Sequence, residues 1–538
     1  MIGISKRFDP IFSKVFYGLL LLMAIGLPLS KALMSIIPGV MFVIWIAEGR
    51  FSTKLLRFKE RKSLQLLISI FFVYLLGLFW TNSLQWGLHD IKIQLPLLAL
   101  PLVIGTSDRL NYRQVKGIIY VFSAAVIVAS FCSIGALLGL NGKIIHDPRE
   151  MSLFISHIRF ALLINISIFS LGWYFLNSEK KNPAEKIVLL ISILWLCTFL
   201  VILKSATGWV VFLTALAATV FIGIFRIKKL VWRVTFSGIL IAIFLLPLIY
   251  IGYVLHLFYT TEPIPENINS LRTSRGNVYS NELENKQIEN GHYTFLYIAV
   301  DELRESWEKR SQIKYDSVSP SGYNQYVLFR YMTSKGLRKD ADGVAKLTNK
   351  DIQNIENGMT NYMFGNPFSL YKRIYQIVWE THNYLLGENP AGHSVTQRWE
   401  YYKMAHNIIG DRFWFGHGTG GYYMAYQDEY NQNHFFKNQD YRQRSHNMFL
   451  SYWIDFGIVG MIYICFALIA PIFLEHKGRS FLLLVFMLIV LLSFMNEDTL
   501  NNHDAISFFA FFYPLYLYSS YEKWDDLKIL DDKPPQMT

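Results

Sequence analysis

Residues 480–497 read SFLLLVFMLIVLLSFMNE, and this stretch of sequence decides the fold class of the chain. Its first sixteen residues carry no charged side chain. A bilayer core is about 30 Å thick, so a helix that crosses it needs roughly 20 predominantly apolar residues. The stretch therefore predicts a membrane-spanning helix in the last part of the chain.

Eleven further apolar runs lie on either side of this stretch. They are found near 15–30, 32–47, 64–80, 88–105, 116–140, 153–176, 187–203, 206–225, 232–259, 447–473 and 503–521. The first two runs are short and share the break from Pro28 to Lys31, which suits a tilted or re-entrant hairpin. The chain is thus predicted to be an all-α polytopic membrane protein with about twelve transmembrane helices.

The distribution of Lys and Arg predicts how these helices are oriented. With the N-terminus on the cytoplasmic side, the inner segments carry 24 Lys and Arg residues, whereas the short outer loops carry four. Cytoplasmic loops are enriched in these residues, so both termini are predicted to be cytoplasmic. The N-terminal segment has a basic start but no small-residue cleavage site, which favours a retained first helix over a removed signal peptide.

A polar stretch, residues 260–445, follows the ninth predicted span and is therefore expected on the outside. It contains 21 Lys and Arg residues and 21 Asp and Glu residues. The formal net charge of +11 thus belongs to the membrane part, where it reports orientation, and no nucleic-acid partner is expected. The stretch is rich in Tyr, Asn and Gly. This composition is common in surfaces that bind sugars, and it is equally common in other polar ectodomains.

The predicted organisation has four parts. They are 1–259 with the first nine helices, 260–445 as a mainly helical external loop domain, 446–521 with the last three helices, and 522–538 as a cytoplasmic tail. Within the loop, residues 282–290 and 301–314 are predicted to form exposed helices.

Cysteine and metal-ligand patterns are uninformative in this chain. Cys132, Cys197 and Cys465 fall inside predicted spans, so the external loop is expected to fold without a disulfide. The sequence has no CxxC, no HExxH and no His/Cys cluster. No metal and no other cofactor is therefore expected.

Two motifs occupy the last part of the loop. Residues 396–409 have apolar side chains at helical spacing and predict an amphipathic helix with Arg398 on its first turn. Next comes Gly416-His417-Gly418-Thr419-Gly420-Gly421, which suits either a tight turn or a close approach of backbone N–H groups to a phosphate or sugar. No Lys-Ser or Lys-Thr follows it, so a nucleotide-binding loop is not indicated.

A third motif, Arg442-Gln443-Arg444-Ser445-His446-Asn447, lies at the outer mouth of the tenth predicted span. A neutral imidazole at this depth can accept a proton from a hydroxyl group. Guanidinium groups match the geometry of a diphosphate. The alternative is that these Arg and His side chains only reach toward lipid headgroups from the end of a helix.

Other polar residues gather on the same side of the predicted membrane. They are His89, Asp90 and Lys92 at the fourth span, Arg149, His157 and Arg159 at the sixth, Lys204 before the eighth, and Glu497, Asp498, His503 and Asp504 between the last two. Lys92 and Arg159 fall within predicted spans, where an ionisable side chain is costly and points to function. A solvated cavity at the outer leaflet is therefore predicted.

Together these residues resemble the O-antigen ligase and O-antigen polymerase superfamily. The resemblance rests on Arg398-Trp399, on the turn of Gly416, Gly418 and Gly420, on His446-Asn447 followed by Leu450, Asp455, Gly457 and Gly460, and on Asn496-Glu497-Asp498-Thr499-Leu500 before a final aromatic span. The close match covers residues 394–504, and the rest of the chain agrees in topology.

The resemblance implies a multi-pass protein of the bacterial inner membrane whose large loop, between the ninth and tenth helices, is periplasmic. It implies a metal-independent, inverting glycosyltransferase that needs no cofactor. The donor would be a glycan on undecaprenyl diphosphate, and the acceptor would be lipid A-core or another glycan. Membrane lipids would be the remaining partners.

The resemblance also assigns roles to particular residues. His446 would be the base that activates the acceptor hydroxyl, and Arg398 would bind the diphosphate. Substrate binding is further expected of Arg444, Arg159, Lys204, Asn447, Gly418 and Glu497. Members of the superfamily often have an Arg where this chain has Ala206, so Lys204 or Arg159 is expected to supply that charge.

Three alternatives stay open at this point. Within the superfamily, the chain could be a polysaccharide polymerase or a protein O-glycosylation ligase, because no motif names the acceptor. A lipid or polysaccharide transporter also has twelve spans, although transporters commonly consist of two related halves with charged residues near the midplane. A receptor or scaffold is supported only by the large loop.

Overall fold

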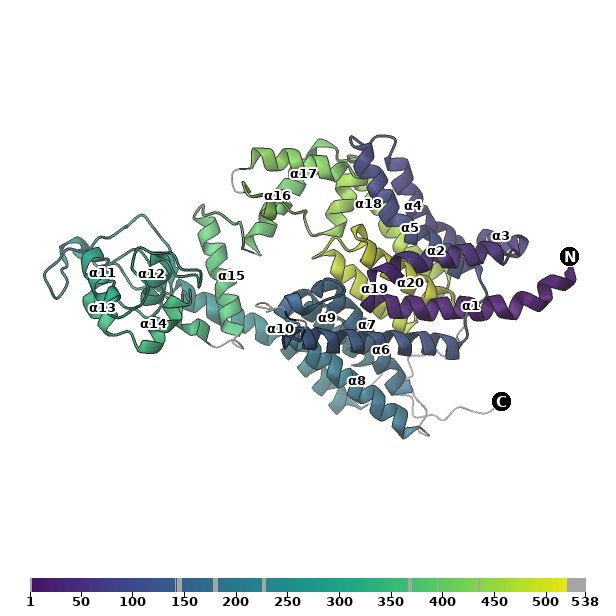
Figure 1. Cartoon of the computed structure of the whole chain (residues 1–538), viewed down its shortest axis with the longest axis horizontal. Coiled ribbons are helices and arrows are strands. Elements are labelled where there is room, and N and C mark those ends of the chain that lie inside the picture. The colour runs from purple at the N-terminus through teal and green to yellow at the C-terminus, as the bar shows by residue number, and fades with distance from the viewer. Residues whose placement is uncertain are drawn as a thin grey trace. The chain divides into compact units, whose positions relative to one another are not determined.

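The computed structural model describes residues 2–140, 142, 148–177, 182–224, 229–365, 370–393, 395–433 and 436–519. Within these residues nearly all of the regular secondary structure is helical, so the predicted all-α class is confirmed (Figure 1). The chain forms two compact units. The first, here the helical unit, comprises Met1–Leu240 and Tyr401–Thr538, and the second, here the loop unit, comprises Ile241–Glu400.

Thirteen of the described α-helices lie wholly in the helical unit. They are α1 (Ile2–Leu29), α2 (Lys31–Ala47), α3 (Phe51–Glu60), α4 (Lys62–Gly77), α5 (Leu84–Thr106), α6 (Tyr112–Leu137), α7 (His157–Asn177), α8 (Pro183–Ile202), α9 (Ala206–Ile224), α17 (Gly421–Gln432), α18 (Met448–Leu474), α19 (Phe481–Phe494) and α20 (His503–Tyr518). Two more helices, α10 (Leu230–Tyr259) and α16 (Thr396–Asp411), have residues in both units.

Eight of the described helices are long and apolar enough to cross a membrane: α1, α5, α6, α7, α8, α9, α10 and α18. The number rises to nine if α2 and α3, which are bent by 115° at their junction, count as one span. Helices α4 and α19 are apolar but shorter. Each of the twelve predicted apolar runs coincides with a helix. The total of twelve spans and the periplasmic position of the loop stay predictions.

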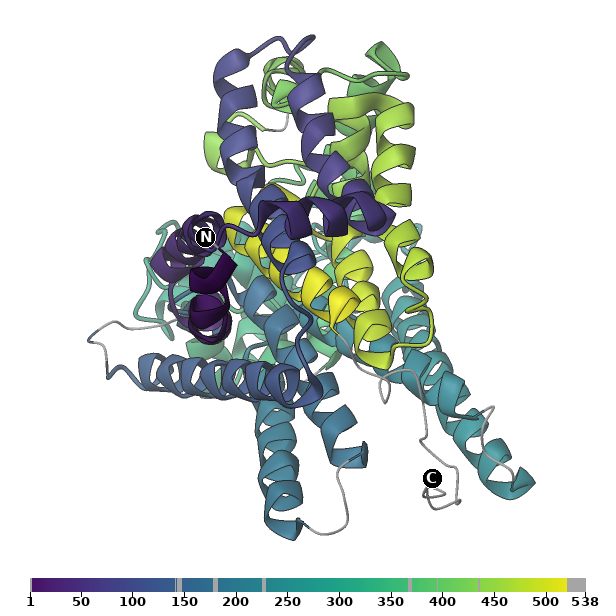
Figure 2. The ribbon, with the colours of Figure 1, turned by 90° about the vertical axis from the view of Figure 1, so that its right-hand side faces the viewer.

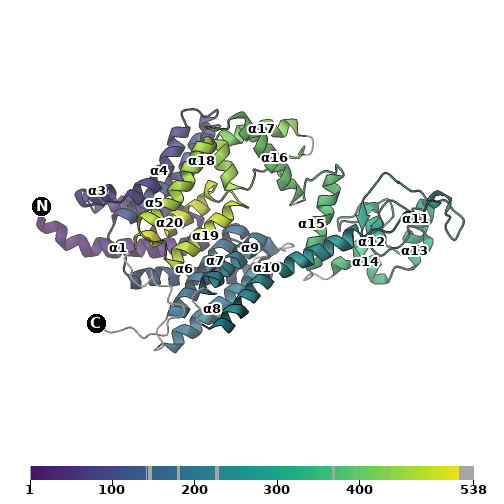
Figure 3. The same cartoon turned by 180° about the vertical axis from the view of Figure 1, so that it is seen from behind.

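Helix α20 forms the centre of the helical unit. From Ala505 to Tyr518 its side chains are buried on every face, as expected for a helix that is apolar all round and enclosed by other helices. It packs against α5, and α5 packs against α4. Figure 2 shows α20, in yellow, crossing the middle of this unit. Figure 3 shows α4 and α18 side by side, in agreement with their contacts.

The loop unit contains five short α-helices and one β-hairpin among its described residues. These elements are β1 (Ile288–Glu289), β2 (His292–Tyr293), α11 (Val300–Glu308), α12 (Gln325–Ser334), α13 (Ala341–Ala345), α14 (Asn349–Glu356) and α15 (Leu370–Leu385). Buried aromatic side chains fill its core, where Trp307 stacks on Tyr323 with ring centroids 5.5 Å apart.

The two helices predicted in the loop have different outcomes. Helix α11 confirms the first part of the prediction for 301–314, but it ends at Glu308. The helix predicted at 282–290 is wrong, because this segment ends in β1. Asn290 and Gly291, with φ of 46° and 83°, connect β1 to β2. An Asn-Gly pair in this conformation makes the two-residue turn of a β-hairpin, and that signal is stronger than the helical pattern around it.

A buried ion pair links the hairpin to α12. The Arg330 Nε donates to Glu289 Oε1 at 2.5 Å, and Glu289 is completely buried. The second carboxylate oxygen accepts from Asn361 Nδ2 at 2.9 Å and from the Tyr375 hydroxyl at 3.0 Å. The Arg330 guanidinium lies 3.8 Å from the centre of the Trp379 ring. Both charges are therefore fully compensated inside the unit.

Removing one partner of this pair is expected to destabilise the loop unit. In Glu289→Ala the charge of Arg330 would stay buried without a counter-charge, and such a change costs about 3–5 kcal/mol. The measurement is limited proteolysis of the purified full chain over a range of temperatures, with the cleavage sites identified by mass spectrometry. Cleavage within 260–390 should begin at a lower temperature than in the wild type.

The matched control is Glu284→Ala, because Glu284 is exposed and lies in the same segment. Its cleavage pattern should follow that of the wild type. Equal resistance of the two variants would contradict a structural role for the buried pair.

Candidate functional site

Helix α18 is broken at Gly457. Residues 413–418, which include the first part of the glycine motif (416–421), form hydrogen bonds with the backbone on both sides of this break. Gly457 has φ 65° and ψ −176°, so the helical hydrogen bonds across it cannot form. The His417 N–H donates instead to the Ile454 carbonyl at 2.8 Å, and the Gly418 N–H donates to the Asp455 carbonyl at 2.8 Å. On the other side of the break, the Ile458 N–H donates to the Phe413 carbonyl at 2.9 Å. Residues 413–418 thus replace the missing hydrogen bonds of α18.

The opposite side of the glycine motif contacts α4 and α5. The Thr419 N–H donates to the Gly77 carbonyl at 3.1 Å, and its hydroxyl donates to the Tyr74 carbonyl at 2.6 Å. Space is restricted here: a Cβ on Gly418 would lie 2.6 Å from the Gly77 oxygen, and one on Gly420 would lie 2.5 Å from the Gly87 nitrogen. The glycines are therefore required for close packing of three helices.

This arrangement favours the turn over the phosphate-binding interpretation of the motif. The N–H groups of Gly416, His417, Gly418 and Thr419 all donate to protein carbonyl groups. Gly418 was expected to contribute to substrate binding, but its N–H is bonded to Asp455. A structural role accounts for all of its observed contacts.

Arg444 is held over the aromatic side chains of α17. Its guanidinium carbon lies 4.4 Å from the centre of the Tyr422 ring and 4.8 Å from that of Tyr423. One guanidinium N–H donates to the Tyr423 hydroxyl at 2.7 Å. Trp86 of α5 stacks on Tyr423 with ring centroids 4.0 Å apart. The plane of the guanidinium is thus fixed by stacked aromatic rings.

The charge of Arg444 is not neutralised by a close partner. Within the described part of the chain no carboxylate forms an ion pair with it, and one of its five N–H donors is occupied. Burial lowers the pKa of Arg444, but the two tyrosines and the carboxylates of Asp498 and Asp90 raise it by more, so the guanidinium stays charged. A positioned cation with free donors suits a phosphate ligand.

Three buried carboxyl groups lie on the elements around Arg444. Asp90 belongs to α5, Asp455 to α18, and Asp498 to the segment between α19 and α20. Asp498 accepts from the Ser451 hydroxyl at 2.7 Å, and Asp455 accepts from the Tyr422 N–H at 3.3 Å. These hydrogen bonds connect α17, α18 and the 495–502 segment into one cluster.

His446 and Asn447 occupy the entrance to α18. Asn447 is the N-cap of the helix, because its side-chain oxygen accepts from the N–H groups of Phe449 and Leu450 at 3.0 and 3.2 Å. His446 has a left-handed φ of 50°, and its ring centroid lies 6.2 Å from that of Tyr401. Asn447 therefore has a structural role as the N-cap of α18, and its contribution to substrate binding stays a prediction.

Hydroxyl groups hold the segment that precedes His446. The Tyr401 hydroxyl donates to the Tyr441 carbonyl, and the Tyr430 hydroxyl donates to the Gln443 carbonyl. The Arg442 Nε donates to the Phe436 carbonyl at 3.1 Å. Arg442 is thus tied to its own loop, whereas Arg444 faces α17.

The remaining expected residues of the helical unit lie elsewhere or at the margin of this cluster. Arg159, at the start of α7, pairs with Asp504 at 3.4 Å. Lys204 is exposed on the turn before α9, and Ala206 begins that helix. Arg159 on α7 and Lys204 before α9 thus lie on other elements than those that form the Arg444 cluster. Glu497 is half-buried and directly precedes Asp498.

Arg398 belongs to the loop unit and is described there. It lies on the first turn of α16, which begins at Thr396 and confirms the predicted helix. Its side chain is half-buried and has no hydrogen bond or ion pair to any residue that the structure describes. Ser394, two residues before this helix, lies outside the described residues.

The tyrosines beneath Arg444 were not among the expected site residues. Tyr422 and Tyr423 follow the glycine motif directly, and Trp86 lies four residues before Asp90. A Tyr-Tyr pair at a helix start is the sequence signal that could have identified them. The aromatic support of a cation depends on long-range packing, so spacing alone does not reveal it. In the described ranges no group of three or more His, Cys, Asp or Glu side chains could hold a metal ion.

Part of this cluster lies in a segment that matches a known family. Residues 358–465 match a family model described as O-antigen ligase. The matched segment contains Arg398, the glycine motif, Arg444 and His446. A search of curated proteins found no match to the chain.

The substitution Gly418→Ala tests the structural role of the glycine motif. A left-handed backbone costs a non-glycine residue about 1–2 kcal/mol, and the overlap with Gly77 adds to this. The melting temperature of the purified protein in detergent is therefore expected to fall. Gly410→Ala in α16 is the control, because nothing lies within 4 Å of its Cβ position, and the substitution should raise helix stability slightly. An unchanged melting temperature in Gly418→Ala would contradict the packing argument.

Proposed function

From the match of residues 358–465 to the O-antigen ligase family model, we propose that the chain transfers a glycan from undecaprenyl diphosphate to a sugar hydroxyl of lipid A-core. The reaction would take place at the periplasmic face of the bacterial inner membrane. The observation that carries the proposal is the position of Arg444, a charged guanidinium without an ion-pair partner among the described residues, two residues before His446.

The reaction is a single displacement at the anomeric carbon of the donor sugar. The acceptor oxygen forms a bond to this carbon as the bond to the diphosphate oxygen breaks, so the configuration inverts. His446 accepts the proton of the acceptor hydroxyl. The bonding electron pair leaves with the lipid diphosphate, whose developing negative charge a cation stabilises.

Arg444 is suited to receive this developing charge. Its donors are presented in a plane that stacking on Tyr422 and Tyr423 maintains, so little orientation has to be gained on binding. A diphosphate is already an activated leaving group, and electrostatic stabilisation by fixed cations suffices for its departure. This chemistry requires neither a nucleotide nor a metal ion.

Arg398 is proposed to bind the diphosphate as well, on the strength of the resemblance. Its guanidinium has no partner in the described structure, so its donors are available to a ligand. Lys204 has an exposed ammonium group and Arg159 is engaged with Asp504, which makes Lys204 the better substitute for the Arg expected at Ala206.

Variants of the three proposed residues, His446, Arg444 and Arg398, should lose transfer without losing the fold. His446→Ala removes the base, and general-base catalysis is worth about 10²–10⁴-fold in rate. Arg444→Lys keeps the charge but removes the planar donors and the stacking, so the rate should fall by at least tenfold. Arg398→Ala is expected to abolish transfer. The measurement is glycan attachment in membranes that contain equal amounts of each variant.

Two exposed residues supply the controls for this experiment. His406→Ala and Arg272→Ala remove the same side-chain types from positions outside the cluster, and both should transfer glycan at the wild-type rate. Near-normal attachment by His446→Ala would refute the assignment of the base.

The acceptor can be identified by deleting the protein in its native host. Gel analysis of surface glycans should then show loss of all long-chain material on lipid A-core, as expected for a ligase. A product with a single repeat unit would instead identify a polymerase, and unchanged lipopolysaccharide would refute both activities.

A further inference from the structure

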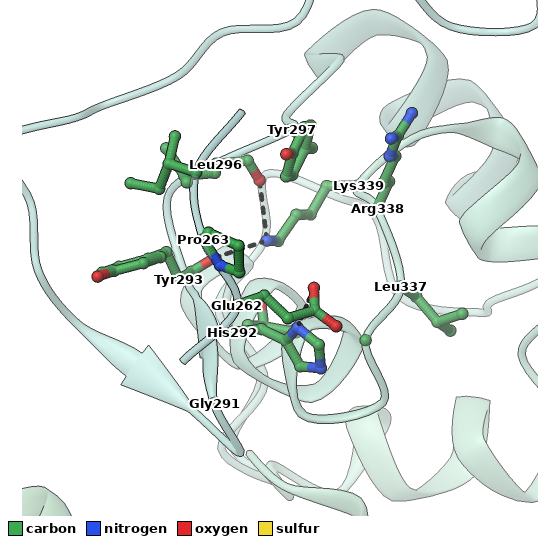
Figure 4. A pocket seen from close by; sticks show the side chains of 13 residues that line it. Glu262, Pro263, Gly291, His292, Tyr293, Leu296, Tyr297, Leu337, Arg338 and Lys339 are labelled. Carbon is green, nitrogen blue, oxygen red and sulfur yellow. Dashed lines mark hydrogen bonds and ion pairs between the residues drawn. The ribbon is translucent and has the colours of Figure 1, made fainter. Parts of the chain in front are cut away.

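The loop unit contains a cavity of about 280 Å³ that lies outside the segment matching the O-antigen ligase family. Sites for small molecules have volumes from about 300 to 1,000 Å³, so the cavity lies just below the lower limit of this range. Its lining is mostly polar and includes Glu262, His292, Tyr293, Tyr297, Arg338 and Lys339 (Figure 4). No role in the proposed transfer accounts for these residues.

The backbone around the cavity is firmly held. The Lys339 N–H donates to the Tyr297 carbonyl at 2.9 Å, and the Ala299 N–H donates to the Lys339 carbonyl at 2.9 Å. The hairpin at Gly291 forms another wall, where a Cβ would lie 2.5 Å from the Thr260 oxygen. The cavity is thus built from paired segments and a tight turn.

Lys339 is a buried cation that has no ion-pair partner among the described residues. Only 2% of its surface is exposed, and its ammonium group donates to the carbonyl groups of Leu296 at 3.0 Å and Tyr293 at 3.4 Å. No carboxylate in the described ranges forms an ion pair with it. Figure 4 shows the ammonium group among the lining residues of the cavity, bonded to these two carbonyl oxygens.

Such an arrangement is costly unless an anion is bound. A buried ammonium group without a paired charge loses several kcal/mol of hydration, which carbonyl groups replace only in part. Burial lowers the pKa of Lys339 to about 7, so its positive charge is easily lost. The buried pair of Glu289 and Arg330 in the same unit shows the opposite solution, in which each charge has its partner.

The other charges at the cavity leave an excess of positive charge. The His292 Nδ1 lies 3.2 Å from Glu262 Oε2, so the acidic group has its own partner. Arg338 is exposed, and its guanidinium carbon lies 4.7 Å from the centre of the Tyr297 ring. Tyr297 has a left-handed φ of 57°, a strained conformation for a tyrosine, and such strain is typical of functional positions.

We propose that this cavity binds an anionic sugar residue of a glycan substrate, with its carboxylate or phosphate between Lys339 and Arg338 and its ring against Tyr297. Tyrosine rings offer sugars an apolar face, and the two cations supply donors for the acidic group. The choice of a glycan as the ligand class rests on the proposed function, whereas the preference for an anion rests on the charges of the cavity.

Binding of simple sugars to the purified full chain tests the proposal. The probes are glucuronic acid and glucose 6-phosphate, with glucose as the neutral counterpart, titrated in ligand-observed NMR experiments. At least one of the acidic sugars should bind at least tenfold more tightly than glucose. Lys339→Met and Arg338→Gln should each weaken that binding at least tenfold.

The controls separate a binding role from a structural one. Lys346→Met changes an exposed lysine outside the cavity and should bind like the wild type. Arg338 is exposed, so Arg338→Gln is expected to keep the wild-type melting temperature even if Lys339→Met is less stable. Equal binding of acidic and neutral sugars, or wild-type binding by Arg338→Gln, would overturn the proposal.

The pH dependence gives a second readout. Lys339 is protonated below its pKa of about 7 and loses its charge as the pH rises, so affinity for an acidic sugar should fall between pH 6 and pH 8. The neighbouring side chains of the cavity that can carry charge are Glu262, His292 and Arg338. The fall should persist in His292→Gln, and its disappearance there would assign the titration to the histidine and refute the role of Lys339.

Failure of this proposal can be distinguished from failure of the proposed function. Wild-type binding of acidic sugars without any glycan transfer would refute only the transferase assignment. Transfer that depends on His446, together with no binding preference for acidic sugars, would refute only the anionic subsite.

Discussion

The insertion of residues 413–418 into the break of α18 is the interaction on which the rest of the helical unit depends. Backbone N–H and C=O groups in an apolar environment must be paired within the protein. Gly457 leaves the carbonyl groups of Ile454 and Asp455 without their helical partners, and the glycine motif supplies new ones. Because Thr419 also bonds to the end of α4, one short segment joins α4, α5 and α18.

The candidate site follows from this junction. Helix α17 begins at Gly421, the last residue of the glycine motif, so Tyr422 and Tyr423 on its first turn are fixed close to α5 and α18. Arg444 then rests on these rings, and Asn447 starts α18 two residues after the buried Ser445. The residues best suited to chemistry are thus held by backbone hydrogen bonds and stacked rings.

The cations of the chain show three electrostatic environments. Arg330 is neutralised by Glu289 and serves the fold of the loop unit. Arg444 and Lys339 have no such partner in the described structure, yet both are held by aromatic rings or carbonyl groups. An unneutralised but well-positioned cation is the common feature of the two proposed ligand sites. The difference between them lies in their neighbours: burial alone lowers the pKa of Lys339 to about 7, whereas tyrosines and carboxylates outweigh the effect of burial on the pKa of Arg444.

The sequence by itself determined the class of the protein and the composition of its helices. Each predicted apolar run coincides with a helix, because the apolar character that places a segment in the interior or in lipid is a property of its own composition. The motif around His446 and the resemblance to the O-antigen ligase superfamily were equally visible, since they rest on residues close together in the chain. The Asn290-Gly291 pair also indicates a turn, but the pattern of the surrounding residues favoured a helix.

Only the tertiary structure decided what the glycine motif does, what supports Arg444 and where Lys339 lies. The partner of Gly418 is Asp455, the rings beneath Arg444 come from α17, and the carbonyl groups around Lys339 belong to a segment more than forty positions earlier. These hydrogen bonds and buried contacts join residues that are distant in sequence, so the spacing of residues along the chain does not predict them. A cavity with an unpaired cation exists only after such long-range contacts have formed.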